Sequence, residues 1–382
     1  MQIYYWCPYL TNIATIKSVI RSAKSLRKYI KLNLSAKNEI TILNTSGEWS
    51  FLKKNSFNIE VKDVLPFVFF KYLPKEGFIQ SRLSFLIIFF TNFFPLLLLI
   101  RNKKPTYLVV HLLTILPILL SPLLSQHTRI ILRISGLPNL NFFRKFIWKL
   151  FSKYIYAVTA PTKLTYNVIL DSKIFDKNKV KLLRDPVIDC SEIQIMKNYP
   201  IDYNFDNNKF YLSIGRLTGQ KNFTFLIKTF SKFIKDFKVK KLLIIGEGEN
   251  ENTLKKIIVK YKMENNIFLL GFKENVYNYI NKCEALISVA EYEDPGFALI
   301  ETAYLKKKLI SSLVKNGPIE MKNSGDMGYF FEYNNELELL SAIKDSEKNN
   351  KNMLLEALKY AKKFSVFSHC KNFEKILKET IN

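Results

Sequence analysis

Short apolar or β-branched runs alternate with longer amphipathic stretches along most of the chain. The runs that predict strands in the first half are residues 1–7, 39–44, 106–111, 129–134, 156–161 and 179–185. In the second half they are residues 210–216, 241–248, 266–272, 284–290 and 308–313. Strands that alternate with helices in this way are typical of βα units and parallel sheets.

Helical patterns fill most of the intervals between these strands. Residues 14–30 and 139–155 carry such patterns, and further helices are predicted to begin near Asn222, Asn250, Asn275 and Phe297. Residues 185–208 show weak periodicity and contain two prolines, so we place a domain boundary near residue 200. The fold class predicted is α/β, with two Rossmann-like, doubly wound domains, because 382 residues exceed the size of one core.

Two long apolar runs, residues 84–100 and 107–124, resemble a membrane hairpin. A spanning helix needs about 20 apolar residues. The first run has 17 and contains Asn92 and Pro95, and the second is interrupted by His111 and two prolines. We therefore expect a buried helix, then a buried strand at 106–111, then a helix whose apolar face dips into the lipid interface.

The charge is strongly positive and unevenly spread. The formal net charge is +25, and residues 1–200 carry 29 Lys and Arg against 10 Asp and Glu. No acidic residue occurs from Gly77 to Leu170, although eleven basic residues do. Such a block attracts phosphates or anionic lipid, so an anionic membrane surface is an expected partner. The alternative is a coding bias that enriches lysine throughout. Nucleic acid is not expected as a partner, because no known binding motif accompanies the charge.

The four cysteines, Cys7, Cys190, Cys283 and Cys370, are scattered and show no metal-binding spacing. They predict free thiols in a reducing compartment. The first residues show no basic stretch followed by an apolar run, so nothing predicts secretion. We expect a cytoplasmic protein, peripheral on the inner face of the plasma membrane.

The segment EDPGFALIE at residues 293–301 carries the strongest chemical signal, because it follows a predicted strand directly. Open α/β sheets bind ligands at the carboxyl ends of their strands. The amides of the helix that opens at Gly296 would face an anion. Glu293 and Glu301 can accept hydrogen bonds from hydroxyl groups of the same ligand. Arg216 and Lys221, in the loop after the strand at 210–216, supply the cations that a diphosphate needs.

Four ordered motifs, GRLTGQKN, IIGEGENENTL, LLGFKEN and the paired-glutamate segment, resemble glycosyltransferase family 4, the group 1 transferases of the GT-B fold. The resemblance covers about residues 210–312. It implies a C-terminal nucleotide-sugar-binding domain at 201–365, an N-terminal acceptor domain at 1–200, and a closing helix at 366–382 that crosses back to the N-terminal domain.

The resemblance also implies roles for residues. Arg216 and Lys221 would hold the donor diphosphate, Glu293 the donor sugar, Glu301 the ribose, and the backbone around Phe272 the base. The remaining donor-binding positions implied are Gly215, Gly296, Phe297, Ala298 and Leu299. Such enzymes retain anomeric configuration without a divalent metal, and no DxD motif stands in a suitable loop, so no cofactor or metal is expected.

The N-terminal half resembles the family more loosely. Its first loop has Asn12 and Thr15 where relatives have paired glycines, and Thr15 is expected either to offer its amide to the ligand or only to cap a helix from Ile16. His111 ends one predicted strand and matches a common histidine of the family, and Arg133 closes another. For both residues a structural role stays open beside a cleft role.

We expect a retaining transferase that moves a sugar from a nucleotide diphosphate sugar to a glycan or lipid-linked acceptor. The expected setting is biosynthesis of lipopolysaccharide, O-antigen or capsule. A sugar-nucleotide epimerase or hydrolase is the alternative, because the same fold hosts both.

Overall fold

The computed structural model describes residues 2–11, 14–29, 39–54, 59–75, 77–101, 104–124, 127–202, 210–236, 240–348 and 350–379. The chain forms two compact units, one from Met1–Pro186 with Val366–Asn382 and one from Val187–Ser365. The division falls at Pro186, whereas weak periodicity places it near residue 200. The reason is that Val187, Ile188 and Ile193 are buried in the core of the second unit.

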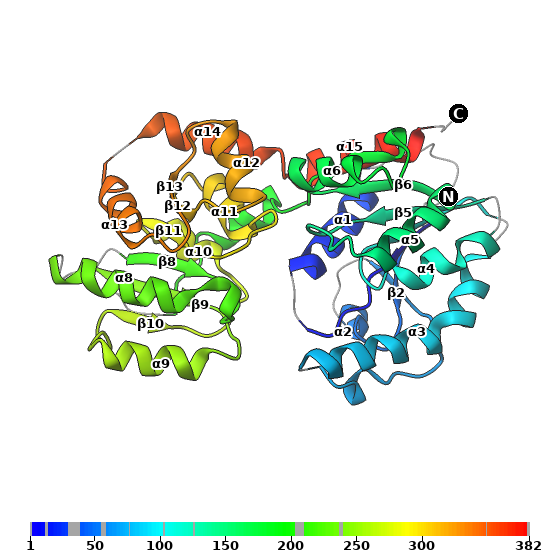
Figure 1. The fold of residues 1–382 in the computed structure, drawn as a ribbon, viewed down its shortest axis with the longest axis horizontal. Helices are drawn as coiled ribbons and strands as arrows, with labels where there is room; N and C mark the ends of the chain where they lie inside the picture. Colours follow the sequence, from blue (N-terminus) through cyan, green and yellow to red (C-terminus); the bar gives the residue numbers. More distant parts are fainter. Residues whose placement is uncertain are drawn as a thin grey trace. The chain divides into compact units, whose positions relative to one another are not determined.

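The first unit is a parallel sheet covered by helices on both faces (Figure 1). Its strands are β1 (Gln2–Trp6), β2 (Glu39–Asn44), β3 (Glu60–Asp63), β4 (Thr106–Val110), β5 (Thr128–Arg133), β6 (Ile155–Ala160) and β7 (Val180–Leu182). Its α-helices are α1 (Ala14–Tyr29), α2 (Ser50–Lys54), α3 (Phe78–Ile100), α4 (Ile115–Leu120), α5 (Phe142–Phe151), α6 (Lys163–Asp171) and α15 (Val366–Lys378). The strand order is β3-β2-β1-β4-β5-β6-β7. The chain adds β2 and β3 on one side of β1 and then β4 to β7 on the other side, so the order switches between β1 and β4.

The two faces of this sheet hold separate cores, because alternate strand residues point to opposite sides. Tyr5 and Val109 face a core shared with α1 and α15, whereas Trp6 and Val110 face a core shared with α3, α4, α5 and α6. The closing helix α15 is held by His369, whose Nε2 lies 2.8 Å from Ser22 Oγ of α1 and whose Nδ1 lies 2.7 Å from the Arg184 carbonyl oxygen.

The second unit repeats this architecture. Its strands are β8 (Phe210–Ile214), β9 (Lys241–Ile245), β10 (Ile267–Leu269), β11 (Ala285–Ser288), β12 (Lys308–Ser312) and β13 (Tyr329–Phe331). Its α-helices are α7 (Cys190–Met196), α8 (Phe223–Asp236), α9 (Glu251–Lys260), α10 (Tyr277–Lys282), α11 (Phe297–Tyr304), α12 (Gly317–Ser324), α13 (Glu336–Asp345) and α14 (Lys351–Lys362). The order β10-β9-β8-β11-β12-β13 again reverses beside the first strand, between β8 and β11. The predicted pair of doubly wound domains is confirmed.

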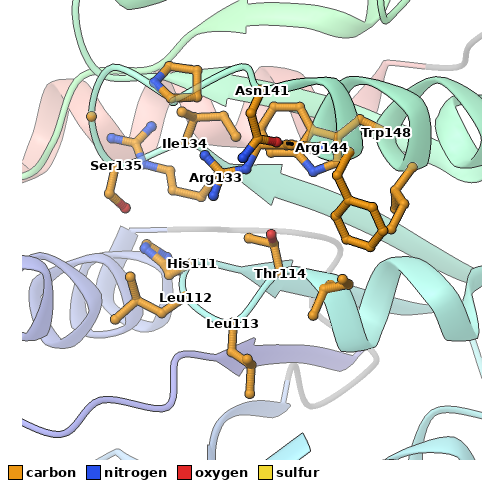
Figure 2. Close-up of a pocket in the computed structure, with 15 residues that line it drawn as sticks. His111, Leu112, Leu113, Thr114, Arg133, Ile134, Ser135, Asn141, Arg144 and Trp148 are labelled. Atoms are coloured by element: carbon orange, nitrogen blue, oxygen red, sulfur yellow. Dashed lines mark hydrogen bonds between the residues drawn. The ribbon is translucent and has the colours of Figure 1, made fainter. Parts of the chain in front are cut away.

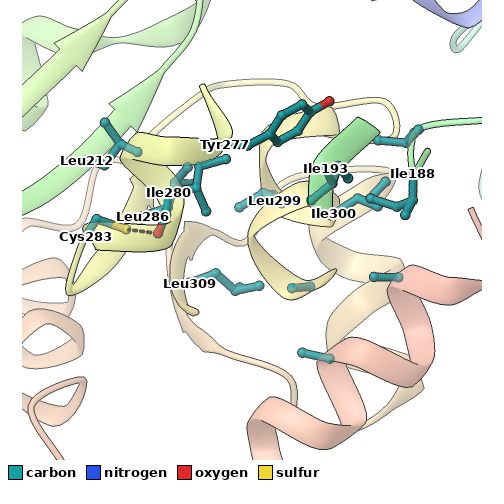
Figure 3. Close-up of a cluster of buried hydrophobic side chains, with 14 of the residues drawn as sticks. Ile188, Ile193, Leu212, Tyr277, Ile280, Cys283, Leu286, Leu299, Ile300 and Leu309 are labelled. Carbon is teal, nitrogen blue, oxygen red and sulfur yellow. Dashed lines mark hydrogen bonds between the residues drawn. The ribbon is translucent and has the colours of Figure 1, made fainter. Parts of the chain in front are cut away.

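Helix α11 is fixed by its apolar face, which Figure 3 shows inside a cluster of buried side chains. Leu299 and Ile300 are almost fully buried there, together with Ile193 of α7 and Leu309 of β12. Because this packing sets the direction of α11, it also fixes where the amino end of the helix lies at the sheet edge.

The apolar runs of the first unit differ from the prediction. The strand β4 is fully buried, as expected. The helix after it, α4, is short and mostly buried, so it does not present the lipid-facing surface that the sequence suggested. The preceding helix α3, predicted to be buried, is instead the exposed one: in its most apolar stretch only 28% is buried. Among the described residues, one helix is long and apolar enough to cross a membrane, and it is this one, from Ile79 to Ile100.

Candidate active site

The loop after β8 brings Lys221 to the carboxyl edge of the second sheet. Gly215 makes room for this side chain, because a Cβ at Gly215 would lie only 2.9 Å from Lys221 Cε. The loop after β9 packs against the same turn, where the Leu217 amide donates to the Glu247 carbonyl oxygen at 2.9 Å. At Gly246, whose φ is +146°, a Cβ would lie 1.9 Å from the Gly215 carbonyl oxygen. Glycines at these positions therefore let two loops and a lysine share one small space.

Lys221 forms an ion pair with Glu293. The distance between Lys221 Nζ and Glu293 Oε1 is 2.6 Å, and the two side chains are 19% and 13% exposed. Ser288 at the end of β11 donates a hydrogen bond of 3.2 Å to the same carboxylate oxygen. The sequence named both charged residues but not their pairing, because they lie 72 positions apart.

Two further hydrogen bonds join the loops that carry this pair. The Gln220 side-chain amide donates to the Tyr292 carbonyl oxygen at 2.9 Å, and the Glu291 amide donates to the Gln220 carbonyl oxygen at 2.9 Å. Behind them the Gly317 amide donates to the Glu293 carbonyl oxygen at 3.1 Å. The backbone on both sides of Glu293 is thus held, which limits the positions that its carboxylate can take.

The amino end of α11 follows Glu293 directly. Gly296 precedes the helix with φ of 86°, a left-handed conformation that favours glycine. Helical hydrogen bonding starts with the Ile300 amide, which donates to the Gly296 carbonyl oxygen at 3.1 Å. The amides of Phe297, Ala298 and Leu299 have no acceptor within the helix, and such a helix end can bind an anion beside the ion pair.

Arg216, Phe272 and Glu301 lie on the loops after β8 and β10 and on helix α11 after β11. Arg216 lies exposed in the same loop as Lys221. Glu301 is 4% exposed, and its Oε1 accepts a hydrogen bond of 3.1 Å from the hydroxyl of Tyr277. The side chain of Phe272 is exposed, and its amide donates to Glu247 Oε1 at 3.3 Å. One sheet edge therefore gathers two cations, two carboxylates and a helix amino end, which suits a ligand with a diphosphate and several hydroxyl groups.

The first unit holds a cavity of 480 Å³ at the carboxyl ends of β4 and β5. Figure 2 shows residues 111–114 on one side of it, facing Ile134, Ser135, Arg144 and Trp148 on the other. Most of the lining is apolar, and Arg144 supplies a cation whose Cζ lies 5.7 Å from the Trp148 ring centre. None of the lining residues is acidic.

Two buried polar atoms of this lining, His111 Nδ1 and Ser135 Oγ, have no hydrogen-bond partner. The main chain of His111 is fixed, because its amide donates to the Trp6 carbonyl oxygen at 2.9 Å. Burial, and then the nearby Arg133 charge, lower the pKa of His111 to about 3, so the imidazole is neutral at pH 7. A neutral imidazole and a hydroxyl without partners can bind hydroxyl groups of a ligand.

Arg133 also lines this cavity (Figure 2), where a buried ion pair holds it. It is 2% exposed, and its Nη2 lies 2.5 Å from Asp185 Oδ1. Ser18 of α1 donates to the same oxygen at 2.8 Å, and Arg133 also donates to the Leu183 carbonyl oxygen. Burial alone would raise the pKa of Asp185, but Arg133 and these hydrogen bonds outweigh burial and lower it. Arg133 therefore joins β5, β7 and α1, a role that the sequence left open.

For the first loop of the chain, the structure places only one of the two predicted site residues, Thr15. Asn12 lies outside the described residues. Helix α1 begins at Ala14, so Thr15 lies inside its first turn and is not the residue that precedes the helix. All four cysteines are free, as predicted, with Cys190 exposed and the others buried.

The two Rossmann-like units of this chain have the GT-B fold of glycosyltransferases. Residues 197–364 match the family Glycosyl transferases group 1. The match lies within the second unit and identifies that unit as a domain of this transferase family.

Relatives and solved structures agree with this assignment. An uncharacterized glycosyltransferase of Methanocaldococcus jannaschii is 28% identical over 246 residues, 60% of this chain and 60% of its own length. The N-acetylgalactosamine-N,N'-diacetylbacillosaminyl-diphospho-undecaprenol 4-alpha-N-acetylgalactosaminyltransferase of Campylobacter jejuni is 30% identical over 169 residues, 44% of each chain. The matched regions thus span about half the length of these relatives.

The Anabaena protein HepE, solved in complex with UDP, superimposes with a TM-score of 0.70 at 12% identity, over 99% of both chains. At this identity the likeness concerns the fold alone. It extends over both units, including the first unit, which the family match does not cover.

Proposed function

We propose that this protein is a retaining glycosyltransferase that uses a nucleotide diphosphate sugar and works without a metal or cofactor. The observation that carries the proposal is the Lys221–Glu293 ion pair of 2.6 Å, placed directly before the amino end of α11. A cation, a carboxylate and free helix amides at one sheet edge match the diphosphate and the hydroxyl groups of such a donor.

In this proposal Lys221 and Arg216 bind the diphosphate together with the amides of Phe297, Ala298 and Leu299. Because Lys221 is already compensated by Glu293, Arg216 brings the positive charge that the diphosphate requires. Glu293 accepts hydrogen bonds from the donor sugar as well. Glu301 binds the ribose, and the backbone near Phe272 contacts the base.

The reaction exchanges one bond for another at the anomeric carbon. The bond between this carbon and the β-phosphate oxygen breaks, and the acceptor oxygen forms its bond on the same face, so configuration is retained. The acceptor proton passes to the departing phosphate, and the nucleoside diphosphate leaves. Negative charge grows on the phosphate as the bond breaks, so the preorganised cations stabilise the transition state more than the ground state.

The cavity of the first unit is the acceptor site in this proposal. Its apolar walls suit a sugar with an apolar substituent, and His111 Nδ1 and Ser135 Oγ are available for its hydroxyl groups. By its name, the Campylobacter relative acts on a sugar carried by diphospho-undecaprenol. We infer a glycan or lipid-linked acceptor of cell-surface polysaccharide biosynthesis, such as lipopolysaccharide, O-antigen or capsule, used at the inner face of the plasma membrane.

A thermal-shift screen with UDP, GDP, ADP and dTDP sugars, each with and without EDTA, tests the donor site. A ligand that binds only the folded protein raises its melting temperature. We expect one nucleotide class to stabilise the protein equally with and without EDTA. Stabilisation that EDTA abolishes would contradict the metal-independent reaction, and no response to any nucleotide would contradict the donor site.

The variant Arg216→Ala sharpens this test. We expect it to lower kcat by about 100-fold, because one charge-stabilising group is lost at the leaving phosphate. Lys228→Ala is the matched control, since Lys228 is an exposed cation of the adjoining helix α8. Equal activity of both variants would remove Arg216 from the mechanism.

A further inference from the structure

Helix α3 exposes a continuous apolar stripe. Six large apolar side chains, each 52% to 80% exposed, follow one another at intervals of three or four residues: Ile79, Leu83, Leu86, Phe90, Phe94 and Leu98. In a helix this spacing places side chains on one face. Single exposed apolar residues are ordinary, but a stripe of this length along a helix marks an interaction surface.

The opposite face of α3 is built into the first unit. Ile88, Leu96 and Ile100 are fully buried in its cores, and Ser84 donates to the Pro74 carbonyl oxygen at 2.6 Å. Asn92 is also buried and donates to the Ile88 carbonyl oxygen at 2.9 Å. A helix anchored in this way cannot leave its domain to span a bilayer without exposing the core. Any partner of the apolar stripe must therefore contact α3 along its exposed face, while the opposite face stays packed in the first unit.

The charges around the stripe point to an anionic partner. Arg82 lies in the second turn of α3, Arg101 follows its last residue, and Lys104 comes shortly after, all exposed. No acidic residue occurs between Gly77 and Leu170. A second copy of the chain would bring the same cations to the same face, so a two-fold contact would set like charges against each other. Acidic phospholipids match both the charge and the apolar stripe.

We propose that α3 is an interfacial helix, which lies in the plane of an anionic bilayer with Phe90, Phe94 and Leu98 among the acyl chains. This proposal specifies which surface of the protein would contact the membrane. Its functional role rests on the proposed function, in which the acceptor is linked to a lipid. Helix α3 packs on α4, and Figure 1 shows α3, α4 and α5 on one side of the unit.

The same arrangement brings the bilayer to the acceptor cavity. Leu113 packs against the cluster that contains Ile88 of α3, and it also lines the cavity. Helix α5, whose Phe143 and Trp148 line the cavity, exposes Phe142 and Phe146 as well. A lipid-linked sugar could thus reach the cavity while its lipid stays in the membrane.

Vesicle sedimentation tests the surface. The full chain should bind phosphatidylcholine vesicles that contain phosphatidylglycerol, and bind pure phosphatidylcholine vesicles much less. The triple variant Phe90→Ser, Phe94→Ser, Leu98→Ser should bind the anionic vesicles about 100-fold more weakly, because three apolar side chains no longer enter the acyl region. Its melting temperature should not fall, since the replaced side chains are exposed. The control is Val259→Ser with Leu337→Ser, two exposed apolar residues of the second unit.

The depth to which α3 inserts into the bilayer can be measured by tryptophan fluorescence. The three native tryptophans are buried, and since Trp148 lines the cavity, the quenching of the wild-type protein is subtracted as the background. Phe90→Trp should shift to the blue on binding vesicles and be quenched by brominated lipid, whereas Leu337→Trp should do neither. The proposal would be overturned if brominated lipid quenched neither introduced tryptophan. It would also be overturned if the triple variant bound anionic vesicles as tightly as the wild type. A dimer in solution that the triple substitution dissociates, while the wild type ignores vesicles, would overturn it as well.

Activity separates this proposal from the proposed function. The triple variant should transfer sugar to a water-soluble acceptor without a lipid at the wild-type rate, and lose transfer only to acceptors held in vesicles. If no acceptor is glycosylated by either protein, the proposed function fails while vesicle binding still decides the role of α3.

Discussion

Glu293 holds Lys221 by an ion pair of 2.6 Å, across the point where β8 and β11 lie side by side. The pair sets the direction of the lysine, so in the proposed mechanism less conformational entropy is lost when a diphosphate binds. The carboxylate also lessens the positive charge of the site. Both effects make the two residues act as one unit.

We expect Lys221→Ala and Glu293→Ala each to lower kcat about 100-fold, and the double variant to lower it little further. The reason is that either change removes the paired geometry. Kinetics of the single and double variants under saturating donor check this. Losses that multiply in the double variant would show that the residues act independently. Asn222 next to the pair already bonds elsewhere, to Asn334 at 2.7 Å, so Asn222→Ala serves as a neighbouring control.

Filling the cavity of the first unit should affect the acceptor and not the donor. Ser135→Leu places an apolar side chain where Ser135 Oγ faces the cavity, and we expect the acceptor KM to rise by about tenfold or more while donor binding is unchanged. Asn139→Leu, an exposed position outside the lining, is the control. An unchanged acceptor KM in Ser135→Leu would place the acceptor elsewhere.

Acid should destabilise the protein through its buried histidines. Burial, followed by the Arg133 charge, lowers the pKa of His111 to about 3 and that of His369 to about 4, both below the ordinary value of 6.5. The unfolded chain binds these protons more readily, so their contribution to stability is complete above pH 6.5 and falls as the pH drops toward 4.

Chemical denaturation at several pH values measures this slope. His369→Gln should unfold more easily at pH 7 but lose less stability than the wild type between pH 6.5 and 4, since one titrating group has gone. His127→Gln is the control, because His127 is exposed. A wild-type slope in His369→Gln would show that other groups cause the acid sensitivity.

Gly246 should be intolerant of any side chain. In Gly246→Ala the new Cβ would meet the Gly215 carbonyl oxygen at 1.9 Å, at a φ of +146°, and we expect a loss of about 2 to 4 kcal/mol in the free energy of unfolding. Nothing lies within 4 Å of a Cβ at Gly219 in the neighbouring turn. Gly219→Ala should therefore stay within about 1 kcal/mol of the wild type. Equal stability of the two variants would contradict the close packing of the loops after β8 and β9.

The sequence predicted the central strands of both sheets, because each is a short apolar run between helical patterns. It missed β3 and β13, which lie at sheet edges. The four residues of β3, Glu60–Asp63, are mostly charged, and they pair on one side only, with β2. The three residues of β13 form too short a run to mark a strand alone. The other two edge strands, β7 and β10, lie within predicted apolar runs, so composition and length, and not the place at the edge, hid β3 and β13.

The site was predictable as a set of residues but not as an arrangement. Strand ends, a helix start and two basic residues indicated a diphosphate site, since each is a local signal. The pairing of Lys221 with Glu293 and that of Arg133 with Asp185 depend on tertiary contacts. The exposure of α3 was hidden for the same reason, because a uniformly apolar helix does not indicate which side the core will cover.

The chain leaves the first unit at Pro186 and returns at Val366, so the second unit is an insertion within the first. During synthesis, every residue of the second unit emerges from the ribosome before α15, while the first unit still lacks its last helix. His369 and the apolar side chains of α15 must then dock against α1, which is made before the whole second unit. The second unit can therefore complete its folding first, and a nascent chain cut short before α15 would carry a finished second unit beside an incomplete first one.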